Sequence, residues 1–156
     1  SCGDLMRTNY MRSVHARGQI VKCTELARLR ALREFGGVYM DEDVEVLQPF
    51  DKLLRMPFFI GREDNEWING AVMGAAFGTP IVELLYNRFP AHGEGLLGAH
   101  SYGPGYLTPE IQKLHVDVLP PEFFFPYLWN QTREQAVITL STYAMHHWAK
   151  SWVGRY

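Results

Sequence analysis

The sequence predicts an α/β fold in a single domain that covers residues 1–156. Segments with a helical spacing of apolar residues alternate with short apolar runs that are typical of strands. Apolar residues make up 47% of the chain, which is globular composition and argues against disorder. No internal repeat, low-complexity tract or Ser/Gly linker marks a second domain.

Two helices are expected before the first strand. The first spans residues 5–16. The second spans residues 24–35, with Thr24 as its N-cap and leucines at positions 26, 29 and 32 on one face. Gly36 and Gly37 end this helix.

Short strands follow the two glycines. They are expected at residues 38–40, 44–47, 57–60 and 68–74, with an acidic turn at 62–66. Thr79-Pro80 opens a helix that runs to about Arg88.

The last third of the chain is expected to be less regular. Residues 90–106 hold five glycines and are expected to form a loop that closes over a ligand. Residues 114–118 alternate like a strand, and residues 143–146 are a further strand candidate.

The overall charge gives no support for a surface that binds nucleic acid or an anionic membrane. Fifteen basic and 17 acidic residues give a net charge of −2, and no basic face emerges. No apolar run reaches the roughly 18 residues that a membrane span requires. Cys2 and Cys23 have no zinc-binding spacing and are expected to be reduced thiols.

The strongest chemical signal is the segment from Gly36 to Asp43. A short apolar strand, with Tyr39 at its centre, delivers Asp41 and Asp43 two residues apart. Two carboxylates this close repel each other unless a cation lies between them, and hard oxygen ligands suit Mn²⁺ or Mg²⁺. The pattern therefore predicts a metal site.

Other candidates each have a structural alternative. Glu25 and Arg28 are either a surface i,i+3 pair or contacts to a ligand. Of His146 and His147, strand alternation allows one to reach the metal, and the sequence does not say which. Asn69 in an apolar strand needs a hydrogen-bond partner, from backbone or ligand. Trp148 and Trp152 are either core residues, or rings that stack on a sugar, or indole N–H donors to a phosphate.

These pieces occur together in an order that resembles glycosyltransferase family 32, the DxD-containing sugar transferases, especially bacterial members linked to capsular and surface polysaccharides. The resemblance covers about residues 10–152. The matching residues are Glu25, Arg28, Leu32, Gly36-Gly37, Tyr39, Asp41 and Asp43, then residues 46–50 and 63–70, Gly103-Pro104, Leu107-Thr108, residues 121–126, Tyr143, residues 146–148 and Ser151-Trp152.

The resemblance implies a GT-A-like mixed sheet flanked by helices. It implies a metal-dependent, retaining hexosyltransferase that moves a sugar from a UDP- or GDP-linked donor to a glycan or other acceptor. Asp41, Asp43 and Asn69 would be catalytic. The metal ligands would be Asp41, Asp43 and His146 or His147. The donor would contact Glu25, Arg28, Tyr39, Gly103, Pro104, Ser151 and Trp152. A cytoplasmic location is expected, with peripheral association at the inner face of the membrane.

The sequence departs from the family pattern in two ways. The family usually has Asp where this chain has Glu25, and nothing here matches its N-terminal nucleotide-binding strand. An N-terminally truncated fold is therefore expected, or a minimal one with an open pocket. The alternatives are a noncatalytic nucleotide- or sugar-binding remnant and, ranked last, a metal-dependent phosphoesterase, which would need a second metal-ligand set.

Overall fold

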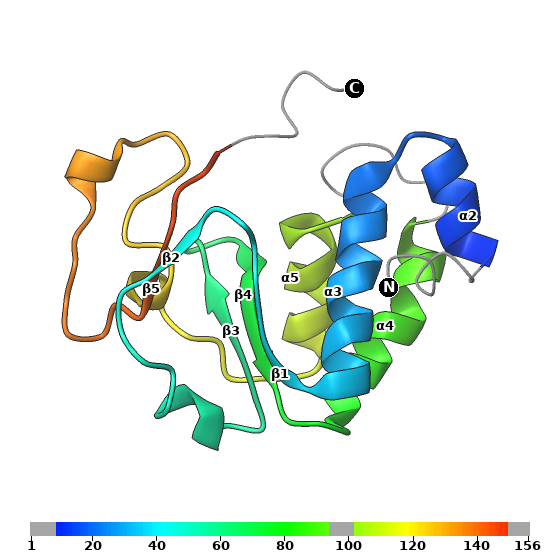
Figure 1. Cartoon of the computed structure of the whole chain (residues 1–156), viewed down its shortest axis with the longest axis horizontal. Coiled ribbons are helices and arrows are strands. Elements are labelled where there is room, and N and C mark those ends of the chain that lie inside the picture. The colour runs from blue at the N-terminus through cyan, green and yellow to red at the C-terminus, as the bar shows by residue number, and fades with distance from the viewer. Residues whose placement is uncertain (1–8, 94–101, 150–156) are drawn as a thin grey trace.

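The computed structural model describes residues 9–93 and 102–149 (Figure 1). Its helices are α2 (Asn9–Ala16), α3 (Ile20–Phe35), α4 (Pro80–Gly93) and α5 (Pro104–Lys113). Its strands are β1 (Gly37–Met40), β2 (Val44–Val46), β3 (Phe58–Arg62), β4 (Ile68–Ala75) and β5 (Ala144–His146). Single 3₁₀ turns lie at η1 (Leu53–Arg55), η3 (Pro121–Phe123) and η4 (Arg133–Gln135).

The strands form two small antiparallel sheets. In the first, β4 lies between β1 and β3, and all eight residues of β4 are buried. The second is the pair β2–β5, which joins segments about a hundred residues apart in sequence. Because β1 and β3 run opposite to β4, the end of β3 lies beside the start of β4, with Arg62 opposite Ile68, and the end of β1 lies beside the middle of β4, with Met40 opposite Val72. The candidate site residues lie toward this end of the strands, which is called the sheet edge below.

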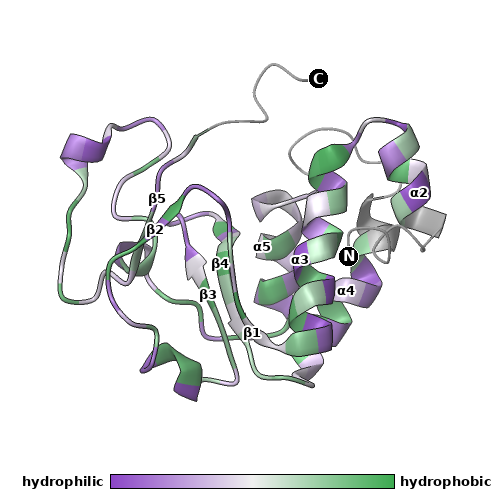
Figure 2. Cartoon of the chain, in the orientation of Figure 1, coloured by the Kyte–Doolittle hydropathy of each residue, from purple (hydrophilic) through white to green (hydrophobic). Residues whose placement is uncertain are grey.

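The three-stranded sheet is covered on both faces. The four helices gather on one side of it, at the right of Figure 1, and the β2–β5 pair lies on the other. Alternation along β3 sends Phe58 and Ile60 into the core shared with the helices and Phe59 into a second core. Figure 2 shows apolar stretches along the strands and polar stretches around the rim. Burial on both faces fixes the strand register.

The helix boundaries differ from expectation at three places. The second helix begins at Ile20, and Thr24 lies inside it, where its hydroxyl donates to the Ile20 carbonyl at 3.2 Å instead of capping the N-terminus. The helix after Pro80 continues to Gly93. Residues 104–113 are helical, because Gly103 turns at φ +52° and Pro104 suits the first helical position.

The expected strand at 114–118 does not form. His115 has φ +50°, which breaks the extended conformation that the alternating pattern indicated. Leu119 alone forms a parallel bridge, with Gly61. The expected closing loop falls mostly on residues 94–101, which lie outside the described residues.

Within residues 9–93 and 102–149, none of the helices has the length and apolar character to cross a membrane. The organisation of residues 1–156 as one domain stays a prediction.

Candidate metal centre

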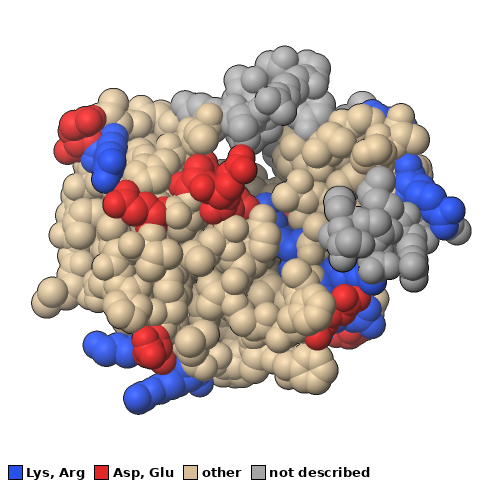
Figure 3. Space-filling view, viewed as in Figure 1, with Lys and Arg blue, Asp and Glu red and all other residues tan. Residues whose placement is uncertain are grey.

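Asp41 and Asp43 follow β1 at the edge of the sheet. The Asp41 amide donates to the Ala71 carbonyl at 2.9 Å, which prolongs the β1–β4 ladder by one residue. The Val44 amide then donates back to the Asp41 carbonyl at 3.2 Å, which makes a tight turn between β1 and β2. Figure 3 shows acidic side chains gathered over this turn. The turn therefore presents the two carboxylates at the surface.

The β2–β5 pair brings His146 to the two aspartates. His146 lies opposite Val44 in the ladder, and its Nε2 lies 3.1 Å from Oδ1 of Asp43. One ligand atom from each of Asp41, Asp43 and His146 lies within 4.8 Å of the others. Side chains about a hundred residues apart in sequence thus form one three-residue group.

His147 points elsewhere. Its Nε2 lies 2.9 Å from Oε2 of Glu45, an oxygen that also accepts from Arg133 at 3.0 Å. Among the described residues, the group that could hold an ion includes His146 and not His147. The alternation expected for adjacent strand residues is observed, and the tertiary structure decides which of the two imidazoles faces the aspartates.

Aromatic rings hold His146 in place. Its ring centroid lies 4.3 Å from that of Trp148 and 5.7 Å from that of Phe125. Burial lowers the pKa of His146 below its ordinary value, and nearby Asp43 and Asp41 oppose this only in part. The imidazole is therefore neutral at pH 7, which is the form that binds metals.

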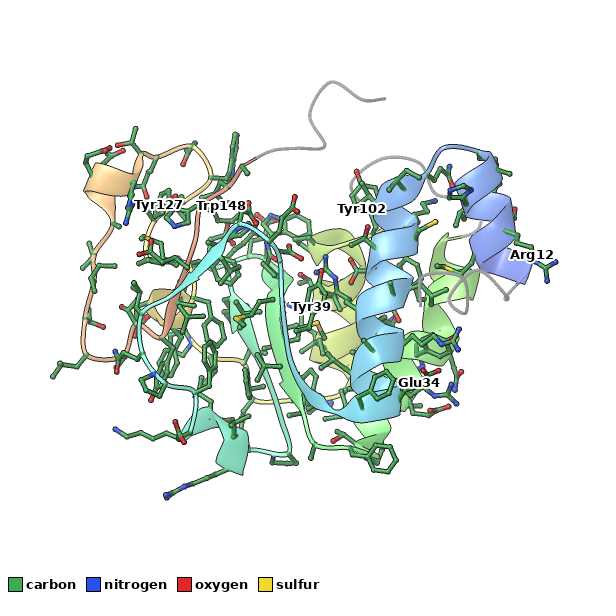
Figure 4. All side chains as sticks on the ribbon, in the orientation of Figure 1. Arg12, Glu34, Tyr39, Tyr102, Tyr127 and Trp148 are labelled. Atoms are coloured by element: carbon green, nitrogen blue, oxygen red, sulfur yellow. The ribbon has the colours of Figure 1, made fainter. Side chains whose placement is uncertain are left out.

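Asp43 also fixes the segment that follows β5. Its backbone carbonyl accepts from the His147 amide at 2.9 Å, and its Oδ2 accepts from the Ala149 amide at 2.8 Å. The indole N–H of Trp148 donates to the Tyr127 carbonyl at 3.1 Å, and Figure 4 shows these two residues together. The indole N–H of Trp148, which was one candidate donor to a phosphate, is therefore bonded to the backbone in this structure. Ser151 and Trp152 lie outside the described residues.

Asp41 is held from the helix side. Its Oδ1 accepts from the hydroxyl of Tyr39 at 2.7 Å and from Nη2 of Arg28 at 3.1 Å. The guanidinium of Arg28 lies 4.7 Å from the centre of the Tyr39 ring, and Figure 4 shows Tyr39 between β1 and α3. Burial raises the pKa of Tyr39 above its ordinary value, so the hydroxyl keeps the proton that it donates.

Arg28 is buried beside a second carboxylate, that of Glu25, at 3.9 Å. Burial acts to lower the pKa of Arg28, but Glu25 and Asp41 outweigh it and hold the pKa above its ordinary value. The side chain fits because residue 70 is glycine: a Cβ there would lie 2.8 Å from Nη1 of Arg28. The i,i+3 pair is thus interior and not a surface feature.

Glu25 contacts the start of α5. The residue is 1% exposed, and its Oε2 accepts from the Gly103 amide at 2.9 Å. Its Oε1 and the Nε of Arg28 are buried without hydrogen-bond partners among the described residues. Gly103 and Pro104, expected to contact the donor, are thereby tied to the helix that carries Arg28.

Asn69, expected to be catalytic, is paired within the protein at the same sheet edge. Its Nδ2 donates to Oε2 of Glu63 at 2.5 Å, and its Oδ1 accepts from the Ala71 amide at 2.8 Å. Glu63 is not among the site residues expected from the sequence. The signal that could have found it is an acidic residue that directly follows an apolar strand.

The donor set fits a divalent cation. Two carboxylates and a neutral imidazole are the ligand types that Mn²⁺ accepts. His146 is 8% exposed, and its Nδ1 is buried without a hydrogen-bond partner among the described residues. The ring nitrogen that lies beside the carboxylates is Nε2, at 3.1 Å from Oδ1 of Asp43, and this is the atom that would bind the ion.

Comparison with known proteins shows which enzymes the chain resembles. Residues 5–59 match the family model described as the glycosyltransferase sugar-binding region containing DXD motif. Over 149 residues the chain is 30% identical to the lactosylceramide 4-alpha-galactosyltransferase of Rattus norvegicus. The aligned segment is 81% of this chain and 40% of that relative. Most of the chain is therefore similar in sequence to glycosyltransferases.

Two further comparisons extend the likeness. The inositol phosphoceramide mannosyltransferase 3 of Schizosaccharomyces pombe is 26% identical over 151 residues, which is 83% of this chain and 42% of that relative. The solved structure of the PaToxG glycosyltransferase superposes with a TM-score of 0.53 at 14% identity, covering 70% of this chain and 45% of that one. The expected α/β, GT-A-like fold class is confirmed.

The chain spans about two fifths of the length of these two curated relatives. The likeness to a family of DXD sugar transferases is confirmed, and the bacterial capsular type stays a prediction. The roles expected for the individual site residues also stay predictions. The structure brings together Glu25, Arg28, Tyr39, Asp41, Asp43, His146 and Gly103.

Proposed function

We propose that this chain is the sugar-transfer domain of a metal-dependent, retaining glycosyltransferase that uses a nucleotide-sugar donor. The observation that carries the proposal is the group formed by Asp41, Asp43 and His146 beside the buried Arg28. Carboxylates that can hold a cation, with a guanidinium behind them, suit the charge of such a donor.

The metal ligands would be Asp41, Asp43 and His146, with Mn²⁺ or Mg²⁺ as the ion. When bound, the cation would neutralise the negative charge of a diphosphate leaving group. Arg28 and Tyr39 orient the Asp41 carboxylate. Trp148 and Phe125 orient the imidazole of His146. Because these side chains are already held by the fold, little reorganisation is needed when the donor arrives.

The acceptor is proposed to be a glycan or headgroup, and a lipid-linked acceptor is the first to test. Two relatives are named for transfer to lactosylceramide and to inositol phosphoceramide. An acceptor of that kind would place the protein at a membrane surface by peripheral association. The cytoplasmic face expected from the sequence belongs to the same proposal.

The test is a panel of UDP- and GDP-linked sugars with Mn²⁺, Mg²⁺ or EDTA, with release of the free nucleotide measured over time. Turnover that requires the metal and disappears in Asp41→Asn supports the proposal. Asp51→Asn is the matched control, because Asp51 is exposed and lies outside the three-residue group. Retention is checked by NMR of the anomeric configuration of the product.

The alternative is a noncatalytic remnant that binds nucleotide or sugar. Metal-dependent binding of UDP or GDP by calorimetry, without turnover of any donor at high enzyme concentration, would assign that role. Hydrolysis of phosphate esters in preference to nucleotide sugars would favour the phosphoesterase alternative and contradict the proposal.

A further inference from the structure

The hairpin between β3 and β4 buries a carboxylate at the edge of the sheet that carries the metal group. Glu63 follows the last residue of β3, and Asn69 is the second residue of β4. The carbonyl of Ala71, two residues further along β4, accepts a hydrogen bond from the Asp41 amide. The strand directions therefore place Glu63, Asn69 and Asp41 at the same edge.

The turn is closed by its own hydrogen bonds. Oδ1 of Asp64 accepts from the amides of Glu66 and Trp67, both at 2.7 Å, and the Glu63 amide donates to the Trp67 carbonyl at 2.9 Å. Asp64 thus caps the turn from the outside, while the Glu63 side chain points inward and is 8% exposed. The two neighbouring acidic residues occupy different environments although they share one turn.

A purely structural role explains this arrangement poorly. Burial raises the pKa of Glu63, the bond from Asn69 opposes this, and Asp64 adds to it. In the described part of the chain no basic side chain forms an ion pair with Glu63. A buried carboxylate with an amide partner and no cation is destabilising relative to a neutral side chain of the same shape. Such costs are typical of functional sites.

A series of hydrogen bonds connects Glu63 to Asp41 of the DXD motif. Glu63 accepts from Asn69 at 2.5 Å, Asn69 accepts from the Ala71 amide at 2.8 Å, and the Ala71 carbonyl accepts from Asp41 at 2.9 Å. A carboxylate can only accept and a backbone N–H can only donate, so Glu63 and the Ala71 amide together fix which end of the Asn69 amide carries the nitrogen. The second N–H of Asn69 then has a defined direction.

We propose that Glu63 is a positioning residue that orients the side-chain amide of Asn69 for hydrogen bonding to the sugar or phosphate of the substrate. This inference rests on the proposed function, because it assigns Asn69 to the same donor site. Glu63 itself takes no proton from the substrate: its function is to accept one hydrogen bond. A neutral acceptor of the same size should therefore replace it.

The experiment compares Glu63→Ala and Glu63→Gln in nucleotide-sugar turnover. Glu63→Ala should lower kcat by about 10- to 100-fold, because a small displacement of a contact group has that effect. The KM of the donor should stay within about twofold, and Glu63→Gln should recover most of kcat. Glu66→Ala and Glu66→Gln are the matched controls, since Glu66 is an exposed acid in the same turn.

A double-mutant cycle separates positioning from general destabilisation. In an Asn69→Ala background, Glu63→Ala should cause no further loss of kcat, because the group that it positions is absent. Three results would overturn the proposal: unchanged kcat in Glu63→Ala, an equal loss in Glu63→Gln and Glu63→Ala, or an undiminished loss in the Asn69→Ala background. An equal loss in both variants would indicate proton transfer instead.

A second measurement does not depend on turnover. The side-chain amide protons of Asn69, observed by NMR of the whole chain, should exchange slowly in the wild type and faster in Glu63→Ala. Unchanged exchange would overturn the proposal even if turnover is found. If the wild type turns over no donor, the proposed function fails, and the amide exchange still decides whether Glu63 orients Asn69.

Discussion

Arg28 on helix α3 donates from Nη2 to Oδ1 of Asp41 at 3.1 Å, and this bond joins the helical layer to the DXD turn. The same oxygen accepts from Tyr39 at 2.7 Å, and the guanidinium packs on the Tyr39 ring. The orientation of the Asp41 carboxylate is therefore set by α3 and β1 together. A substitution that displaces Arg28 should therefore alter the orientation of the Asp41 carboxylate, even if the substituted residue does not contact Asp41.

Gly70→Ala should displace Arg28. A Cβ at residue 70 would lie 2.8 Å from Nη1 of Arg28 and 2.8 Å from Cδ1 of Leu107, so overpacking should destabilise the fold by about 1–3 kcal/mol. Nucleotide affinity in the presence of Mn²⁺ should fall as well. Calorimetry measures the affinity and urea unfolding measures the stability.

Gly61→Ala is the control for Gly70→Ala. Its Cβ would lie 2.6 Å from the Phe124 ring, in the second core, so stability should fall while nucleotide affinity of the folded protein stays. Equal nucleotide affinity in the two variants would show that the position of Arg28 does not matter for binding.

Asp43→Asn should weaken metal binding and loosen the segment after β5. The substitution removes one charge from the metal group and weakens the bonds to His146 and to the Ala149 amide. Mn²⁺ affinity, measured by calorimetry, should fall by more than about tenfold. Amide exchange at Ala149 should become faster. Mn²⁺ affinity equal to that of the wild type would contradict the proposed metal group.

His146→Ala and His147→Ala should differ. Loss of His146 removes a ligand of the proposed metal group, so Mn²⁺ affinity should fall by at least about tenfold. Loss of His147 removes only the partly exposed contact to Glu45, so stability should change by about 0–1 kcal/mol and Mn²⁺ affinity should stay. The reverse order of affinities would exclude His146 as the ligand.

Glu63→Gln should raise thermal stability at neutral pH. The folded-state pKa of Glu63 is raised by burial, so the folded state binds this proton more tightly than the unfolded state does. The cost of the buried charge is therefore present above the folded-state pKa and disappears as pH falls below the unfolded one. The gain in melting temperature should shrink on acidification.

A pH series of melting curves measures this gain, with the exposed Glu66→Gln as the control. A gain that is constant from pH 4 to pH 8, or equal in the control, would show that the Glu63 charge carries no cost in the folded protein.

Local sequence signals predicted the elements on which the site is built. The apolar run after Gly36-Gly37 predicted β1, because β-branched and aromatic residues favour strands and the glycines end α3. Local signals failed at two places, where the backbone or the helix boundary differs from what the pattern predicts. The alternation of residues 114–118 does not form a strand because His115 turns at φ +50°, and Thr24 lies inside α3 although its side chain suits a cap.

By itself, the sequence determined which residue types are present for the chemistry: two carboxylates at the end of a strand, a pair of histidines and an Arg on a helix. These follow from composition and from spacing within a few residues. Only the tertiary structure decided which of them meet. The β2–β5 pairing selects His146 over His147, Gly70 leaves room for Arg28, and the β3–β4 hairpin turns Glu63 inward onto Asn69. Each of these contacts except the last joins segments more than 40 residues apart, and all depend on strand register, which burial of both sheet faces fixes and local sequence does not encode.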